Sequence, residues 1–151
     1  MRIRAFRPED RDFVLRLVPR LTEFGDIPGR DRAAMTARDR EVLEQTMDAP
    51  SPDTALFLAE NEDGPVGVIH LTTADDYYTN AQTAHIADVV VSPDAEGQGV
   101  GSALIAFAEQ WARDRGFGML TLNVFVKNGK ARQLYVRLGF GEEWLRCIKR
   151  L

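Results

Sequence analysis

Two spacings of apolar residues alternate along the 151-residue chain. Apolar residues that recur every three or four positions predict helices, which begin near Pro8, at Asp31, after the glycine-rich stretch that follows Glu96, and at Asn128. Short runs of Val, Ile, Leu and Phe predict β-strands over Met1–Phe6, Thr54–Asn61, Val66–Thr72, His85–Val91, Met119–Val126 and Phe140–Leu151. We therefore expect one α/β domain over residues 1–151.

The stretch from His85 to Phe107 joins a strand rich in Val and Ile to a helix. The connecting loop has glycine at every second position, Gly97, Gly99 and Gly101. A helix that starts directly after such a loop has free backbone N–H groups and the positive end of its dipole at that point. Because glycine adds no side chain that would block a ligand, this arrangement is typical of phosphate or pyrophosphate binding.

Two common phosphate-binding motifs do not match this loop. A dinucleotide-binding fingerprint needs glycine where the sequence has Ser102. A nucleoside triphosphate loop needs a Lys followed by Ser or Thr, and the run Val100-Gly101-Ser102 contains no lysine. The phosphate ligand therefore belongs to another class.

Composition and charge exclude several further classes. The net charge is −4, and the basic residues are scattered, which argues against a nucleic-acid partner. No apolar run approaches the ~20 residues that cross a bilayer, and the start of the chain does not resemble a signal peptide, so we expect a cytoplasmic protein without a membrane partner. Cys147 is the only cysteine, and His70 and His85 lack the spacing of zinc ligands, so we expect no metal site.

The glycine loop resembles the coenzyme A loop of the GNAT superfamily of acetyl-CoA-dependent N-acetyltransferases. That family has Gln/Arg-x-x-Gly-x-Gly/Ala after a strand that ends in Val-x-Pro; here the chain has Val91-Ser92-Pro93 and then Glu96-Gly97-Gln98-Gly99-Val100-Gly101. Glu96 departs from the family's Gln or Arg. The segment Asn128 to Phe140 is similar to the family's Asn-x-x-Ala-x-x-Leu-Tyr-x-x-x-Gly-Phe at every defined position.

This resemblance implies a mixed, largely antiparallel sheet with helices on both faces and a splay between the two central strands, where acetyl-CoA binds. It implies that Tyr135 is the general acid, because a phenol with a pKa near ~10 is protonated at pH 7. The residues that would contact the cofactor lie in the strand, the loop and the second motif: Val89, Val90, Val91, Glu96, Gly97, Gln98, Gly99, Val100, Gly101, Ser102, Asn123, Asn128 and Tyr135. Asn128 is also suited to capping the helix that follows it.

A general base must take a proton from the substrate ammonium, and His85 and Asp88 are the candidates. Strand alternation puts them on opposite faces unless a bulge intervenes, so we expect only one to serve. His85 shares parity with Val89 and Val91, and we favour it. We expect His70 to be a strand residue that hydrogen-bonds a neighbour.

The sequence thus predicts transfer of acetyl from acetyl-CoA to a primary amine of a small molecule by direct attack. Alternatives are acetylation of a protein N-terminus or lysine, an acyl-CoA-binding relative without turnover, for which Glu96 is the argument, and a non-enzymatic interaction domain. The strand-like ending Trp144–Leu151 makes a homodimer a further expectation.

Overall fold

The computed structural model describes all 151 residues. A five-stranded sheet forms its centre, in the order β1 (Arg2–Ala5), β2 (Thr54–Asn61), β3 (Gly64–Asp75), β4 (Gln82–Val91) and β5 (Leu120–Leu122). The first four strands are antiparallel neighbours, and β5 lies parallel to β4. The mixed, mostly antiparallel sheet predicted from the sequence is therefore confirmed.

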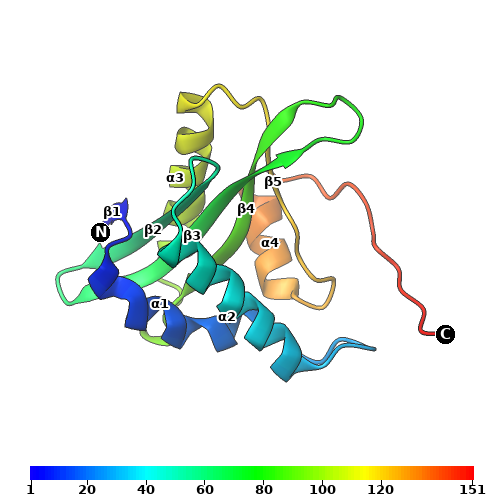
Figure 1. The fold of residues 1–151 in the computed structure, drawn as a ribbon, viewed down its shortest axis with the longest axis horizontal. Helices are drawn as coiled ribbons and strands as arrows, with labels where there is room; N and C mark the ends of the chain where they lie inside the picture. The colour runs from blue at the N-terminus through cyan, green and yellow to red at the C-terminus, as the bar shows by residue number, and fades with distance from the viewer.

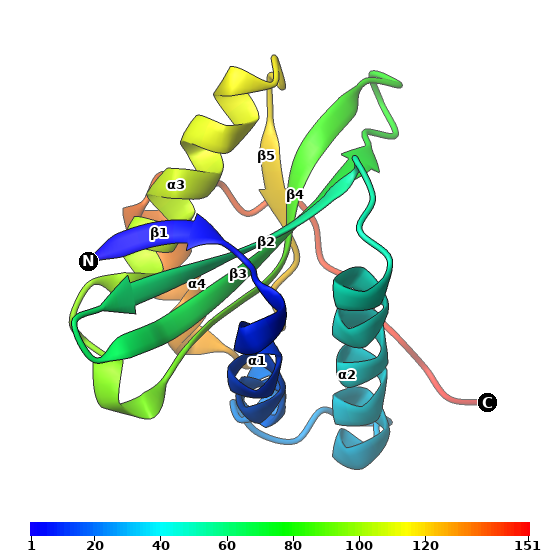
Figure 2. The same ribbon diagram turned by 60° about the vertical axis from the view of Figure 1, so that its left-hand side comes forward.

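Helices cover both faces of this sheet. On one face lie α1 (Arg11–Leu17), the short 3-10 helix η2 (Val18–Thr22) and α2 (Arg32–Asp48), and on the other lie α3 (Val100–Asp114) and α4 (Gly129–Arg137). In Figure 1 the two groups lie on opposite sides of the strands, and Figure 2 shows α1 and α2 separated from α3 by the sheet. None of these helices has both the length and the apolar character needed to cross a membrane.

Local sequence signals account for the helix boundaries. The Asp31 side chain accepts a hydrogen bond from the Ala34 amide, 3.0 Å, which starts α2. Asn128 caps α4 in the same way through the Ala131 amide, 3.2 Å. Pro19 lies where α1 gives way to η2, because proline cannot donate the hydrogen bond that would continue the α-helix.

Each face of the sheet has its own apolar core. Against α3 and α4 pack Ile69, Leu71, Ala84 and Ile86, with Leu104, Ile105 and Trp111 from α3 itself. Against α1 and α2 pack Leu58, Val68 and Val90, with Val14, Val18 and Leu43 from the helices. Side chains that alternate along β3 and β4 enter the two cores in turn, so the faces of these strands can be assigned.

The C-terminal segment differs from the sequence prediction. Residues 141–151 form no strand, and all are exposed, although their apolar residues predicted a closing strand. A strand is stable only where a neighbour supplies hydrogen-bond partners, and this segment pairs with no strand of the chain. β5 is also shorter than predicted: it ends at Leu122, so Asn123 to Val126 lie in a loop.

Candidate active site

The partner strand β5 ends early, and this leaves one edge of β4 open. β5 pairs only with Ala84–Ile86, whereas β4 continues to Val91. Val90 is opposite Val68, and the Ser92 amide donates to Val66, 2.8 Å, so backbone groups of Val90 and Ser92 face β3. Those of Val89 and Val91 therefore point away from β3, along the edge that β5 no longer covers. This is the splay that the sequence predicted.

The glycine loop lies at the end of this open edge. Gly97 and Gly99 have φ of +75° and +80°, a backbone conformation that favours glycine, and a Cβ at either position would meet no atom within 4 Å. The amides of Val100, Gly101 and Ser102 begin α3 and donate to no acceptor in the chain. The loop thus presents free N–H groups over open space.

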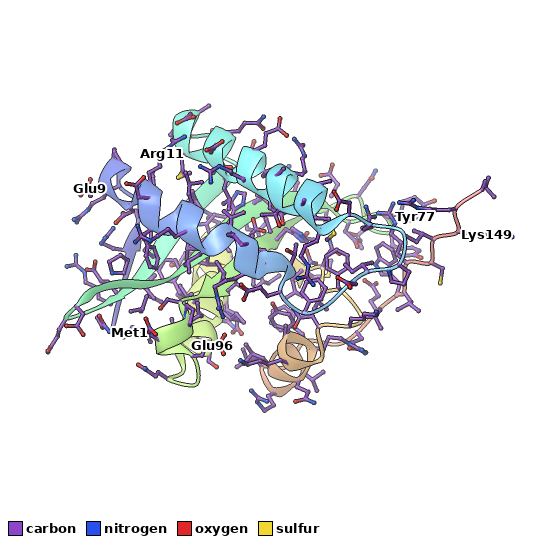
Figure 3. The ribbon with its side chains drawn as sticks, turned by 90° about the horizontal axis from the view of Figure 1, so that it is seen from below. Met1, Glu9, Arg11, Tyr77, Glu96 and Lys149 are labelled. Carbon is purple, nitrogen blue, oxygen red and sulfur yellow. The ribbon has the colours of Figure 1, made fainter.

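Glu96 lies beside this loop and is paired with two cations. Its carboxylate accepts hydrogen bonds from Arg20 of η2 and Lys130 of α4. Lys130 first, and Arg20 second, hold the pKa of Glu96 below its usual range. Figure 3 shows Glu96 between the start of α3 and α4. The carboxylate that departs from the family pattern is therefore neutralised within the chain, and Arg20 also donates through Nε to the Val91 carbonyl, 3.0 Å.

A bulge in β4 decides which side chains share a face. His70 is opposite Asp88 and Leu71 is opposite Ile86, so Ala87 has no partner in β3. The extra residue reverses the alternation, and both His85 and Asp88 lie on the α1–α2 face of the sheet. The sequence placed them on opposite faces unless a bulge intervened, and the bulge does intervene. The expectation that His85 shares the face of Val89 and Val91 is wrong, because Val89 and Val91 pack toward α3.

His85 is held by β5. Its Nδ1 lies 2.8 Å from the Thr121 hydroxyl, which itself donates to the Ala84 carbonyl, 3.3 Å. Because that donation uses the only hydroxyl hydrogen, Thr121 presents a lone pair to Nδ1, and the Nε2 of His85 has no protein partner. Burial lowers the pKa of His85 below its ordinary value of 6.5, although the nearby Asp88 carboxylate partly opposes this shift.

Asp88 belongs to a second polar group on this face. Its carboxylate lies 3.0 Å from the Nδ1 of His70, which is 2% exposed. The expected hydrogen bond of His70 to a neighbour is thus confirmed. Asp39 of α2 is half-buried, and both burial and the negative charge of Asp88 raise its pKa. Neither carboxylate forms an ion pair with a lysine or arginine.

Tyr135 lies on α4, next to the start of α3. The neighbouring Leu134 lies 3.5 Å from the position that a Cβ on Gly101 would take, so the two helices are in contact there. The Tyr135 ring packs against Phe140, with 5.8 Å between ring centroids, and burial raises the pKa of its hydroxyl above 10. That hydroxyl has no hydrogen-bond partner in the chain.

The predicted residues are divided between the two faces of the sheet: His85 and Asp88 lie on the α1–α2 face, whereas Val89, Val91 and Tyr135 pack on the α3–α4 face. Val90 is buried in the α1–α2 core and its backbone is opposite Val68 in β3, while Asn123 is exposed in the loop after β5. Sequence reasoning missed Arg20, Asp39, Thr121 and Lys130. Of these four, only Asp39 could have been found from the sequence. It lies three positions after Thr36 and four before Leu43, and this helical spacing puts it on the inner face of α2.

Comparisons with known proteins agree with this geometry. The model of the Acetyltransferase (GNAT) family matches residues 23–140. An aminoglycoside N(6′)-acetyltransferase of Stenotrophomonas maltophilia is 30% identical over 108 residues, which are 69% of this chain and 71% of the relative. An uncharacterized N-acetyltransferase of Methanocaldococcus jannaschii is 35% identical over 107 residues, or 66% of this chain, but the matched part is only 46% of that protein's length.

Solved structures show the same fold. A protein of Pyrococcus furiosus described as an acetyl transferase superposes with a TM-score of 0.80 at 24% identity, over 99% of both chains. The fold, the open β4 edge and the match over residues 23–140 lead to one conclusion: this chain belongs to the GNAT acetyltransferase family.

Proposed function

We propose that the chain transfers an acetyl group from acetyl-CoA to a primary amine of a small molecule by direct attack, with His85 as general base and Tyr135 as general acid. The observation that carries the proposal is the state of His85. Its Nδ1 is committed to Thr121, and its free Nε2 lies on the same face as Asp88, beside the point where β4 leaves β5.

The chain has groups that fit coenzyme A. Free amides at Val100, Gly101 and Ser102, together with the open space over Gly97 and Gly99, suit a pyrophosphate. Apart from the Val91 carbonyl, which accepts from Arg20, the backbone groups on the open edge of β4 suit the amides of the pantetheine arm, because a strand edge exposes both donors and acceptors. Gln98 and the free amide nitrogen of Asn128 are further contact candidates. When bound, acetyl-CoA would supply the acetyl thioester.

His85 is suited to accept a proton at neutral pH. Its lowered pKa keeps the imidazole neutral at pH 7, and its Nε2 lone pair is free. A substrate ammonium that gives one proton to Nε2 becomes the neutral amine that can attack the thioester carbonyl. Asp88 lies close enough to attract the ammonium form before this transfer.

Tyr135 is suited to the opposite task. Its hydroxyl stays protonated because burial raises its pKa, so it can donate a proton to the departing thiolate sulfur. The products are then the acetamide and the free thiol of coenzyme A. One of the two protons that the ammonium loses balances the thiol, and the other is released to solvent.

A cationic small-molecule acceptor is supported by two observations. Asp39 and Asp88 place two carboxylates on the α1–α2 face, next to His85, and neither has a lysine or arginine partner. A relative that aligns over two thirds of this chain is named for an aminoglycoside, which is a polyamine.

The test begins with calorimetric titration of acetyl-CoA into the chain and into a Gly99→Trp variant. We expect micromolar binding and its loss in the variant, because an indole would fill the loop. Thiol release from acetyl-CoA is then screened with small amines, with a lysine peptide and with a peptide bearing a free N-terminus. His85→Gln and Tyr135→Phe should each lower kcat by about 10²-fold or more. Binding without thiol release would contradict the enzymatic proposal, and release only with a peptide would contradict the substrate class.

A further inference from the structure

Polar side chains from three elements lie in contact beneath the candidate active site. His70 of β3 places Nδ1 3.0 Å from the Asp88 carboxylate of β4 and Nε2 3.4 Å from the Thr46 hydroxyl of α2. Thr46 donates its only hydroxyl hydrogen to the Val42 carbonyl, 3.0 Å, within its own helix, so it has no hydrogen left to donate to His70. Nothing in the proposed proton transfers uses His70 or Thr46, so their arrangement needs another explanation.

The direction of the first hydrogen bond follows from the groups involved. An ionised carboxylate only accepts, so the hydrogen between His70 and Asp88 is carried by Nδ1. Hydrogen bonds to a charged acceptor are stronger than those between neutral groups, and this one is largely shielded from water because the His70 side chain is 2% exposed. A short Asp side chain that accepts such a bond is confined to one orientation.

The Asp88 carboxylate needs this restraint because it lies at an irregular point of the sheet. It follows the bulge at Ala87, at the level where β4 has already lost β5 as a neighbour. Its side chain is 20% exposed, so without His70 it could turn toward solvent. The charge of Asp88 also acts on His85 from β4 and on Asp39 from α2, and neither of them hydrogen-bonds Asp88.

We propose that His70 is a positioning residue, which holds the Asp88 carboxylate on the α1–α2 face so that Asp88 binds the substrate ammonium next to His85. His70 itself is too deeply buried to touch a substrate. This proposal rests on the proposed function for the location of the amine, but it makes a separate claim about amine binding.

Two substitutions separate positioning from packing. His70→Asn keeps an amide N–H at the place of Nδ1 and can still donate to Asp88, whereas His70→Leu fills a similar volume and donates nothing. Both lose the imidazole ring and its packing. A role in packing alone would therefore affect the two variants alike, and a role in holding Asp88 would not.

Amine binding can be followed without turnover, because His70 and His85 are the only histidines in the chain. The protein with ¹⁵N-labelled histidine rings, saturated with coenzyme A, is titrated with 1,4-diaminobutane. The His85 ring, which every His70 variant retains, reports binding. We expect His70→Leu to weaken binding about tenfold and His70→Asn to stay within about threefold of the parent, as expected for one charge-assisted hydrogen bond.

Further variants keep the result decisive. Asp88→Asn should weaken binding as much as His70→Leu does, and the double variant His70→Leu/Asp88→Asn should be no weaker than either single variant. Acetyl-CoA affinity should be unchanged in all of them. Equal weakening in His70→Leu and His70→Asn, no weakening in either, or no binding of the diamine by the parent would overturn the proposal. Diamine binding with this variant pattern but without thiol release would support His70 positioning and contradict the proposed reaction.

Discussion

Gly67 lies where the sheet packs closely against α3, the helix that follows the glycine loop. It lies in β3 opposite Val91, and an added Cβ would stand 3.0 Å from Val100 Cγ1, 3.2 Å from Leu104 Cδ1 and 3.2 Å from the Val90 carbonyl oxygen. Val100 and Leu104 are buried residues of α3, and the third atom belongs to the backbone of β4. The substitution Gly67→Ala should therefore move α3 away from the sheet.

The size of the effect follows from these distances. Carbon atoms pack best at about 3.5–4.0 Å, so the two side-chain contacts must open by a few tenths of an ångström or more. Overpacking of this kind costs roughly 1–3 kcal/mol, and the lower entropy of an unfolded alanine offsets about 0.4–1 kcal/mol of it. We expect a net loss of about 1–2 kcal/mol in the free energy of unfolding, which lowers Tm by roughly 3–6 °C for a chain of this length.

The assay is thermal unfolding together with acetyl-CoA titration, with Gly118→Ala as the matched control. Gly118 has no atom within 4 Å of its Cβ position and no positive φ, so an alanine there changes only the unfolded chain and should leave Tm unchanged or slightly higher. Because Val100 is the first residue of α3, Gly67→Ala should also weaken acetyl-CoA binding, and Gly118→Ala should not. Equal Tm values for the two variants would refute the reasoning, since they would mean that α3 is free to shift.

Three further results are expected. Glu96→Gln removes the negative charge that pairs with Arg20 and Lys130, so both cations can attract phosphates. Calorimetry should then give acetyl-CoA binding about twofold to fivefold tighter at low salt, with a smaller gain as salt is added, and weaker binding would show that Glu96 organises the loop. Because burial lowers the pKa of His85, the acid limb of the pH profile of kcat/KM should lie below pH 6.5 and be absent in His85→Gln, and an acid limb above 6.5 would exclude His85 as the base. The contribution of this pKa shift to the free energy of unfolding should be complete above pH 6.5 and be lost as the pH falls through the lowered pKa. Asp39→Asn should weaken 1,4-diaminobutane binding about threefold while leaving butylamine unaffected, and an equal loss for both amines would argue against a role for Asp39 in recognising the second charge.

Features that depend on neighbours in the chain could be predicted from the sequence. The strand, glycine loop and helix from His85 to Phe107 follow from local spacing and from the conformational freedom of Gly97 and Gly99. The caps at Asp31 and Asn128 are also local, because each side chain reaches an amide only three residues away. These signals were sufficient for the helix boundaries and for the location of the glycine loop.

Features that depend on pairing between distant segments could not be predicted from the sequence. The bulge at Ala87 exists because β3 and β4 shift register there, and no property of the β4 sequence alone marks the extra residue. The same applies to Thr121 against His85, Thr46 against His70, and Arg20 against Glu96, whose partners lie 24 to 76 positions apart. The closing strand was predicted from its apolar residues, but residues 141–151 find no partner strand in the chain.

The sequence by itself thus determined the local elements, the glycine loop and the family resemblance, because these depend on spacings of a few residues. Only the tertiary structure decided which polar side chains meet. One unpaired residue in β4 brought His85 and Asp88 to the same face. β4 continues for five residues beyond Ile86, the last residue that pairs with β5, and this extension leaves an open edge beside them. Both depend on strand register, which is set by contacts across the whole sheet and by the cores on its two faces.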